Sequence, residues 1–414
     1  MTATAAPTGR LITLDALRGF AVMGILAMNI VGFAMPDMAY ITPLASIPKT
    51  AGDTASWLAA FVLVDGKMRG LFSLLFGASM LLIAERATGS GQSAAQVHYR
   101  RMAWLAVFGL AHFFFVWFGD ILFLYAVIGS IAFLARDWTP RRLIQWGLWG
   151  YAFGVLLTGL FFGSLLVLEL MATAPEASPQ IVKIYRDVMS DPEFSLTGAE
   201  QLAVYRGSYA DIVAHRLAEW GSLIGLVLQS IGETLPLMWI GMALYKTGFL
   251  TGRLDHAVYL RWAVRLVPLG LLLSLGAGLG VWVLGLGPVA ALNGLFVWSA
   301  VSRLMLTVGY AALLVMAVRA LDGTTLLKRV AAAGQAAFTN YLATSIVMTS
   351  IFYGYGLGLF GTVGRPWLWL FVLGGWAAML SWSKPWLMRF RYGPFEWLWR
   401  SLARWQLQPL RRKI

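Results

Sequence analysis

The sequence has no cysteine and only four histidines among its 414 residues. The absence of cysteine excludes disulfides, thiolate metal sites and cysteine nucleophiles. So few histidines make a structural zinc site unexpected as well, and we predict no bound metal. Charged residues make up only 12% of the chain, about half of their usual share in a soluble domain.

Apolar residues make up 59% of the chain, and the mean hydropathy is +0.71. Lipid can solvate this much apolar surface, whereas a soluble core could not hide it. A membrane span takes about 20 helical residues. Ten runs qualify: 12–34, 66–85, 102–118, 120–136, 144–170, 222–246, 262–284, 295–318, 335–357 and 367–383. We therefore predict an all-α, polytopic transmembrane helix bundle of about ten helices, forming one domain over residues 1–414.

The net charge of +13 would suggest a nucleic-acid partner in a soluble protein. Here the basic residues gather in alternate connections, at 86–101, 136–142, 246–265, 319–329 and in the tail 384–414. By the positive-inside rule these segments face the cytoplasm. The pattern predicts a multi-pass protein of the bacterial cytoplasmic (inner) membrane with both termini cytoplasmic. Its surroundings would be the lipid bilayer, with no nucleic-acid partner.

Two polar segments lie outside the apolar runs. Residues 171–218 form a long connection that we expect on the outer side, folded into short amphipathic helices. In the basic cytoplasmic tail, Glu396 and Arg400 are spaced to pair on a short helix. The tryptophans of 367–386 suit a membrane interface, or a protein contact such as a homodimer.

Ionisable residues within apolar runs are informative, because each costs at least roughly 2.5–3.5 kcal/mol in hydrocarbon. Asp15 and Arg18 lie three residues apart, on one helix face. They form either an ion pair at the membrane interface or an anion-binding arginine oriented by a carboxylate. Asn29, deeper in the same run, either hydrogen-bonds a neighbouring helix or binds a ligand.

A second group of charged residues is predicted toward the outer side. Asp65 begins the second run, where a carboxylate suits the helix dipole, and Arg69 lies about one turn further in. Arg303 lies within the eighth run and needs a partner there. Glu169 and Glu233 are further candidates, or simply interfacial charges.

A histidine and a carboxylate face each other across a short turn in GLAHFFFVWFGDILFLYAV. Asp120 would orient His112 and make it a general base; alternatively, Asp120 caps a helix and His112 bonds a carbonyl. Tyr125 follows in the same stretch. Asn340 and Tyr341 belong to a polar stripe of the ninth run, which should face the bundle interior or a cavity.

Five separated segments together resemble one family. They are RLITLDALRGFAVMGILAMNI, FSLLFGASM, GLAHFFFVWFGDILFLYAV, GQAAFTNYLATSI and RYGPFEWLWR, in this order over nearly the whole chain. The chain resembles the YeiB-like bacterial membrane proteins, whose activity is unassigned. That family is distantly similar to the transmembrane acyltransferases, including heparan-alpha-glucosaminide N-acetyltransferase.

The distant resemblance implies transfer of an acetyl group from cytoplasmic acetyl-CoA to an acceptor on the far side. The residues that match its motifs are Asp15, Arg18, Gly19, Asn29 and Asp65. The acetyltransferase has its catalytic histidine between its first two helices, whereas residues 35–64 contain no histidine. His112 takes that role here on the predicted topology alone.

The leading hypothesis is an integral-membrane acyltransferase, with acetyl-CoA or another acyl-CoA as donor and a small molecule, lipid or glycan as acceptor. His112 and Asp120 would be its catalytic pair. The residues predicted to bind acyl-CoA or acceptor are Asp15, Arg18, Asn29, Asp65, Arg69, Tyr125, Arg303, Asn340 and Tyr341. The alternatives are a transporter or exporter of a small anionic or amphipathic solute, and a non-catalytic membrane scaffold.

Overall fold

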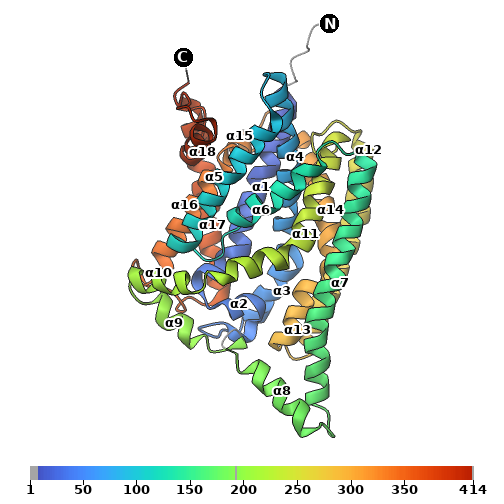
Figure 1. Ribbon diagram of the computed structural model, residues 1–414, viewed down its shortest axis with the longest axis vertical. Coiled ribbons are helices and arrows are strands. Elements are labelled where there is room, and N and C mark those ends of the chain that lie inside the picture. Colours follow the sequence, from blue (N-terminus) through green and yellow to red (C-terminus); the bar gives the residue numbers. More distant parts are fainter. Residues whose placement is uncertain (1–7, 192–193, 413–414) are drawn as a thin grey trace.

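The computed structural model describes residues 8–191 and 194–412, and within these residues it contains helices and no β-strand (Figure 1). The predicted all-α class is confirmed, and each of the ten apolar runs contains a helix. Six helical segments of the described chain are both long and apolar enough to cross a membrane. The chain is therefore a multi-pass membrane protein, while the full count of ten spans remains a prediction.

The six long segments define the frame of the bundle. They are Ile12–Ala34 in α1 (Thr8–Ala34), Asp53–Gly89 across α3 (Asp53–Leu63) and α4 (Lys67–Gly89), Pro140–Ala172 (α7), Gly221–Lys246 (α11), His256–Val283 (α12) and Ala300–Ala320 (α14). The other predicted runs hold α5 (Ala94–Phe115), α6 (Leu122–Ala132), α16 (Ala337–Phe352) and α17 (Leu368–Arg389).

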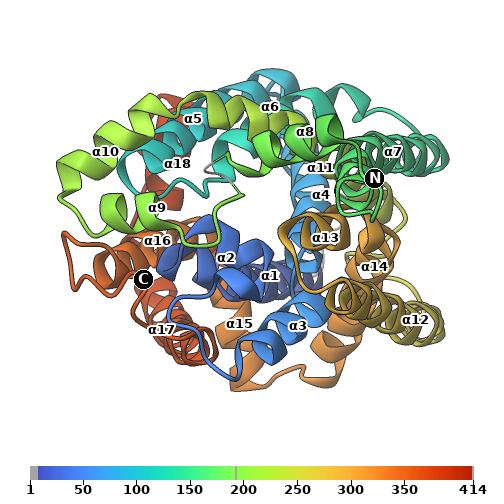
Figure 2. The same ribbon diagram turned by 90° about the horizontal axis from the view of Figure 1, so that it is seen from below.

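Helix α1 is the centre of the bundle, and α7 is its most exposed long helix. Of the most apolar window of each, 78% is buried in α1 but only 6% in α7. Figure 2 places α7 and α12 at the rim, and α1 packs against α4, α16, α17 and α15 (Thr325–Gln335). An apolar helix exposed on most sides is suited to lipid, so α7 and α12 are the lipid-facing edge.

Helices α4 and α11 pack with their backbones in direct contact. A Cβ atom on Gly77 would lie 2.1 Å from Met238 O, and one on Gly241 would lie 2.1 Å from Leu74 O. Small residues permit such close approach in membrane bundles. The close approach fixes α4 and α11 side by side, with the charged residues of α4 facing those of α11.

The two ends of the bundle differ in what they carry. The start of α1, α15 and α18 (Pro394–Arg404) lie at one end, which we call the α18 end (Figure 1). The opposite α8–α10 end carries α2 (Asp37–Ile41), α13 (Pro288–Asn293) and the three helices of the long connection. These three are α8 (Pro179–Met189), α9 (Ala199–Tyr205) and α10 (Tyr209–Ala218). The long connection therefore folds into short helices, as expected.

The predicted pair of Glu396 and Arg400 does not form. Glu396 instead accepts hydrogen bonds from the N–H groups of Phe338 and Thr339, at 2.7 and 3.0 Å, and from the Thr339 hydroxyl. These N–H groups begin α16, where a helix leaves its donors unpaired and favours a carboxylate. The tail helix thus caps a helix of the bundle, and Arg400 stacks on Tyr392.

Candidate functional site

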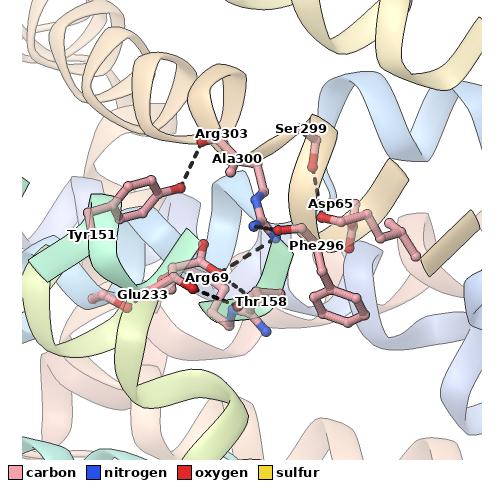
Figure 3. Close-up of polar contacts among 12 residues, drawn as sticks. Asp65, Arg69, Tyr151, Thr158, Glu233, Phe296, Ser299, Ala300 and Arg303 are labelled. Carbon is pink, nitrogen blue, oxygen red and sulfur yellow. Dashed lines mark hydrogen bonds and ion pairs between the residues drawn. The ribbon is translucent and has the colours of Figure 1, made fainter. Parts of the chain in front are cut away.

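Two arginines share one glutamate in the interior between α4, α11 and α14. Arg69 Nη2 lies 2.7 Å from Glu233 Oε2, and Arg303 Nη1 lies 3.6 Å from the same oxygen. Figure 3 shows the three side chains converging from different helices. Both arginines were predicted site residues in need of a partner, and Glu233 is that partner. The predicted alternative of an interfacial charge is wrong for Glu233.

The position of Arg303 depends on a glycine and on a π-helical turn. Gly66 has a φ of +70°, and a Cβ there would lie 2.3 Å from Arg303 Cδ, so only glycine fits beside this side chain. Arg303 Nη2 donates to the Phe296 carbonyl at 3.3 Å, in the π-helical segment Gly294–Trp298. Its Nε is buried and has no hydrogen-bond partner. The Nε–H of Arg303 is therefore an unused buried donor.

The residues that begin α4 extend this charged group toward α2. Tyr40 donates a short hydrogen bond to Asp65 Oδ1. Lys67, only 1% exposed, donates to the Phe61 carbonyl and to Ser274 Oγ. Counting Lys67 and both arginines against Asp65 and Glu233, the ionised group carries one net positive charge. A buried group with surplus positive charge is suited to an anionic ligand.

Tyr125 connects this charged group to the centre of the bundle. Its hydroxyl lies 2.7 Å from Ser73 Oγ and donates to the Arg69 carbonyl at 3.3 Å. The ring lies edge-on to Phe72 and Phe76. Through this hydrogen bond Tyr125 fixes the backbone of α4 at Arg69 and so positions the Arg69 side chain.

The histidine and carboxylate predicted as a general base do meet. His112 Nδ1 lies 2.9 Å from Asp120 Oδ1, with both side chains at most 1% exposed. Asp120 Oδ2 also accepts from the Phe123 N–H at 2.8 Å, so it caps α6 as well. His112 Nε2 is buried without a hydrogen-bond partner. Asp120 therefore both orients the His112 ring and caps α6, and His112 Nε2 stays without a hydrogen-bond partner.

Tyr341 and Asn340 lie next to each other on α16 but have different surroundings. The Tyr341 ring lies 5.2 Å from the His112 ring, and its hydroxyl accepts from the Ile121 N–H. Asn340 donates to the Ala333 carbonyl and to Ser383, and accepts from Trp382. Tyr341 therefore belongs with His112, whereas Asn340 joins α15, α16 and α17.

The Asp15–Arg18 ion pair forms near the α18 end. Arg18 Nη1 lies 3.0 Å from Asp15 Oδ1, and Nη2 donates to Ser79 Oγ of α4 at 2.7 Å. The guanidinium keeps 25% of its side-chain surface exposed. Of the two predicted roles, the ion pair is present, and anion binding by Arg18 remains a prediction.

Two small cavities lie beside these groups. One of about 30 Å³ is lined by Tyr40, Asp65 and Arg365, and one of about 10 Å³ by Asn29 and Tyr341. A water needs about 10–15 Å³, so these spaces admit water but no larger molecule. Asn29 thus lines the cavity next to Tyr341.

Sequence reasoning missed several members of these groups. Tyr40 donates to Asp65, and Tyr151 interacts with Arg303 while its hydroxyl donates to the Ala300 carbonyl at 2.7 Å. A tyrosine in an apolar run is too common to single out. Glu169 accepts from Tyr185 of α8 and lies apart from the charged group.

Comparison with known proteins gives relatives over the full length of the chain. YxaH of Bacillus subtilis (strain 168) is 30% identical over 98% of this chain and 96% of its own. YeiB of Escherichia coli (strain K12) is 32% identical over 95% and 96%. Both are described as uncharacterized proteins. A family model, Protein of unknown function (DUF418), matches residues 244–406, and no solved structure matches. With two such relatives aligned from end to end, this chain belongs to the YeiB-like family.

Proposed function

We propose that the protein is an integral-membrane acyltransferase with His112 as its general base. The observation that supports this most directly is the buried His112–Asp120 pair, in which Nδ1 is bound and Nε2 is not. A carboxylate that fixes the imidazole leaves Nε2 as the reactive nitrogen. A fixed base shielded from water is suited to taking a proton from a hydroxyl or amine.

In the proposed reaction, the acceptor oxygen or nitrogen attacks the thioester carbonyl of an acyl-CoA. His112 Nε2 takes the acceptor's proton as the new bond to carbon forms. The carbon–sulfur bond then breaks, and the sulfur leaves with that proton as the CoA thiol. Tyr341, whose ring centre lies 5.2 Å from that of His112, would donate a hydrogen bond from its hydroxyl to the developing oxyanion and keep its proton. The products are the acylated acceptor and free CoA, with no further reactant.

The donor would reach this base along α1. Arg18 and Asn29 are eleven residues apart, which is roughly 16 Å of helix at the α-helical rise. If Arg18 binds the phosphates of acyl-CoA, the extended thiol arm would cover this distance. The thioester would then lie beside Asn29, Tyr341 and His112. The proposal includes the orientation with the α18 end in the cytoplasm of the bacterium, where acyl-CoA is made.

An open state is part of the proposal. Both small cavities have room only for water. Trp117 covers His112 from one side, with its ring 4.0 Å from Phe33 and its Nε1 bonded to the Gly32 carbonyl. Acyl-CoA would therefore enter only after the connection between α5 and α6 moves away from α1.

The test uses the purified full-length protein in nanodiscs, with acetyl-CoA or a longer acyl-CoA and a panel of amine and hydroxyl acceptors. Because the chain has no cysteine, a thiol reagent reports only the CoA that is released. We expect acceptor-dependent release, with His112→Ala lower by a factor of roughly 10²–10⁴. Wild-type protein that neither binds nor consumes any acyl-CoA would refute the proposal.

His98 provides a matched control on the same helix. It is also buried, but its Nε2 contacts the Gly129 carbonyl at 3.1 Å and its ring stacks on Phe133. His98→Gln should therefore retain acyl transfer whenever the variant folds. Equal losses in His98→Gln and His112→Ala would mean that the loss comes from packing and not from proton transfer.

A second candidate function is transport of a small anionic solute. The observation that favours it is the charged group of α4, α11 and α14, with its surplus positive charge and the unpaired Arg303 Nε. Transporters place paired ionisable residues of this kind along the solute path.

Flux into proteoliposomes separates the two functions. Uptake of an anion without acyl-CoA, abolished by Arg303→Met and retained in His112→Ala, would establish transport. If substitution of the ionisable residues changes neither acyl transfer nor anion uptake in folded protein, the result would favour the non-catalytic scaffold.

A further inference from the structure

Arg216 on α10 is the most completely buried arginine of the described chain. The residue is 1% exposed, although it belongs to the long polar connection. Its Nε, Nη1 and Nη2 are all buried without a hydrogen-bond partner. A guanidinium has five N–H donors and is always charged, so Arg216 presents an unsatisfied cation inside the protein.

The surroundings of Arg216 are aromatic. Its guanidinium carbon lies 5.8 Å from the centre of the Tyr205 ring and 5.6 Å from that of Tyr353. The two rings are 4.8 Å apart, and both contact Phe360. The Tyr353 hydroxyl is itself buried without a partner, so the ring that contacts the cation carries a second unpaired donor.

The carboxylates nearby are engaged elsewhere. Glu219 contacts His215 Nε2 at 3.2 Å. Asp37 accepts from the side chain of Gln201 at 3.0 Å. Among the described residues, no ion pair joins Arg216 to a carboxylate. The Tyr205 hydroxyl is near, but no N–H of Arg216 points to it with hydrogen-bond geometry.

Attraction to the aromatic rings does not balance this burial. A cation–π contact near the 6 Å limit is weak, while a buried guanidinium without acceptors loses its whole hydration. The five N–H groups of Arg216 and the phenol of Tyr353 therefore lie where the described part of the chain supplies no acceptor. We propose that Arg216 and Tyr353 form a binding site for a small monovalent anion, a halide or a small carboxylate.

The anion would join two parts of the α8–α10 end. Arg216 comes from α10, and Tyr353 follows the end of α16. Two hydrogen bonds already connect the end of α9, just before α10, to the segment after α16: Gly354 N–H donates to the Tyr205 carbonyl at 2.8 Å, and the Arg206 side chain donates through Nε to the Phe360 carbonyl at 2.8 Å. A bound anion would fasten α10 to this junction, independently of any acyl transfer or transport.

Anion-dependent thermal unfolding tests the site on the purified full-length protein in detergent. Chloride, formate or sulfate replaces gluconate at constant ionic strength, and tryptophan fluorescence gives the melting temperature. A ligand of the native state raises the melting temperature with saturation. We expect this for chloride or formate and not for sulfate, which is larger and divalent. Whichever of chloride and formate has the lower half-saturating concentration shows whether the site prefers a halide or a small carboxylate.

Two substitutions and one control assign the effect. Arg216→Met should abolish the saturable rise, and Tyr353→Phe should raise the half-saturating concentration severalfold while keeping the ring. Arg206→Met loses hydrogen bonds to carbonyls, so it should lower the melting temperature equally in gluconate and chloride. If Arg216→Met does not fold, Tyr353→Phe decides. A wild-type protein insensitive to every anion, or an unchanged rise in Tyr353→Phe, would overturn the site.

Discussion

At the scale of single residues, interior carboxylates each serve more than one partner. Glu233 serves two arginines, and Asp120 serves both a histidine and a helix end. Removing the shared carboxylate therefore differs from removing one of the cations that use it.

Glu233→Gln should destabilise the protein by about 3–5 kcal/mol, because it leaves Arg69 and Arg303 as uncompensated neighbouring charges. Arg69→Met should cost less, since Glu233 keeps Arg303 as its partner. Unfolding in detergent measures both variants and their double mutant. Equal losses in the two single variants would contradict the shared role of Glu233.

Asp120→Asn separates the two roles of Asp120. The amide oxygen can still accept from the Phe123 N–H, so the start of α6 should remain folded. An amide no longer stabilises the imidazolium that forms when His112 takes a proton. We expect a nearly normal melting temperature with acyl transfer lowered by roughly 10²-fold or more. Full activity in Asp120→Asn would remove Asp120 from the proposed mechanism.

At the scale of elements, a short helix can be attached to the bundle by a side chain that caps a longer helix. The tail helix α18 is the clearest case, because its Glu396 accepts hydrogen bonds from the first N–H groups of α16. The basic tail, predicted to hold only an internal Glu396–Arg400 pair, thus contributes to the packing of the bundle.

Glu396→Ala should lower stability by about 1–3 kcal/mol, because the N–H groups of Phe338 and Thr339 lose their acceptor in a buried place. Glu396→Gln keeps one acceptor oxygen and should lose less. Arg400→Gln is the matched control, since Arg400 contacts the Tyr392 ring and not α16. Thermal unfolding of the three variants gives the order, and a larger loss in Arg400→Gln would contradict the cap.

The start of α10 gives a prediction of pH dependence. The Ser208 hydroxyl donates to Asp211 Oδ2 at 2.6 Å, and this bond with that from the Ser208 N–H holds the pKa of Asp211 below 3.8. Because the folded pKa is the lower one, the stabilisation is present above the unfolded value and is lost as the pH falls through the folded pKa.

The measurement is the melting temperature of wild type and of Asp211→Asn between about pH 2.5 and 6. This range extends roughly one to two pH units to either side of the ordinary aspartate pKa. The wild type should be the more stable at the upper end, and the difference should vanish at the lower end. Asp187→Asn, on the exposed surface of α8, is the control. A difference that grows on acidification would contradict the sign.

At the scale of the whole molecule, the two ends are chemically different. The tail, α15 and the beginning of α1 share one end, and α8, α9 and α10 share the other. The charge pattern predicts that the first of these ends faces the cytoplasm.

Single cysteines can test this orientation, because the chain has none of its own. Ser90→Cys and Thr324→Cys lie in connections of the α18 end, and Ser190→Cys lies beside α8. In intact cells, a membrane-impermeant maleimide should label only Ser190→Cys, while permeabilised cells should show all three. Labelling of Thr324→Cys before permeabilisation would reverse the proposed topology.

The positions of the helices could be predicted from the sequence, but the contacts between helices could not. Composition and run length predicted ten apolar runs, each of which contains a helix, because lipid imposes a minimum length and excludes charge. The His112–Asp120 and Asp15–Arg18 pairs were also within reach, since they are close in the chain. The contacts of Glu233 with Arg69 and of Glu396 with Thr339 join residues far apart in the chain, and a single sequence carries no register between helices.

The central place of α1 has a consequence for biosynthesis. This helix leaves the ribosome before α15, α16 and α17, yet it packs against all three. Until they arrive, α1 must wait in the bilayer with Asp15 and Arg18 three residues apart, each neutralising the other. Their pairing therefore lowers the cost of holding α1 in the membrane before these three helices are made.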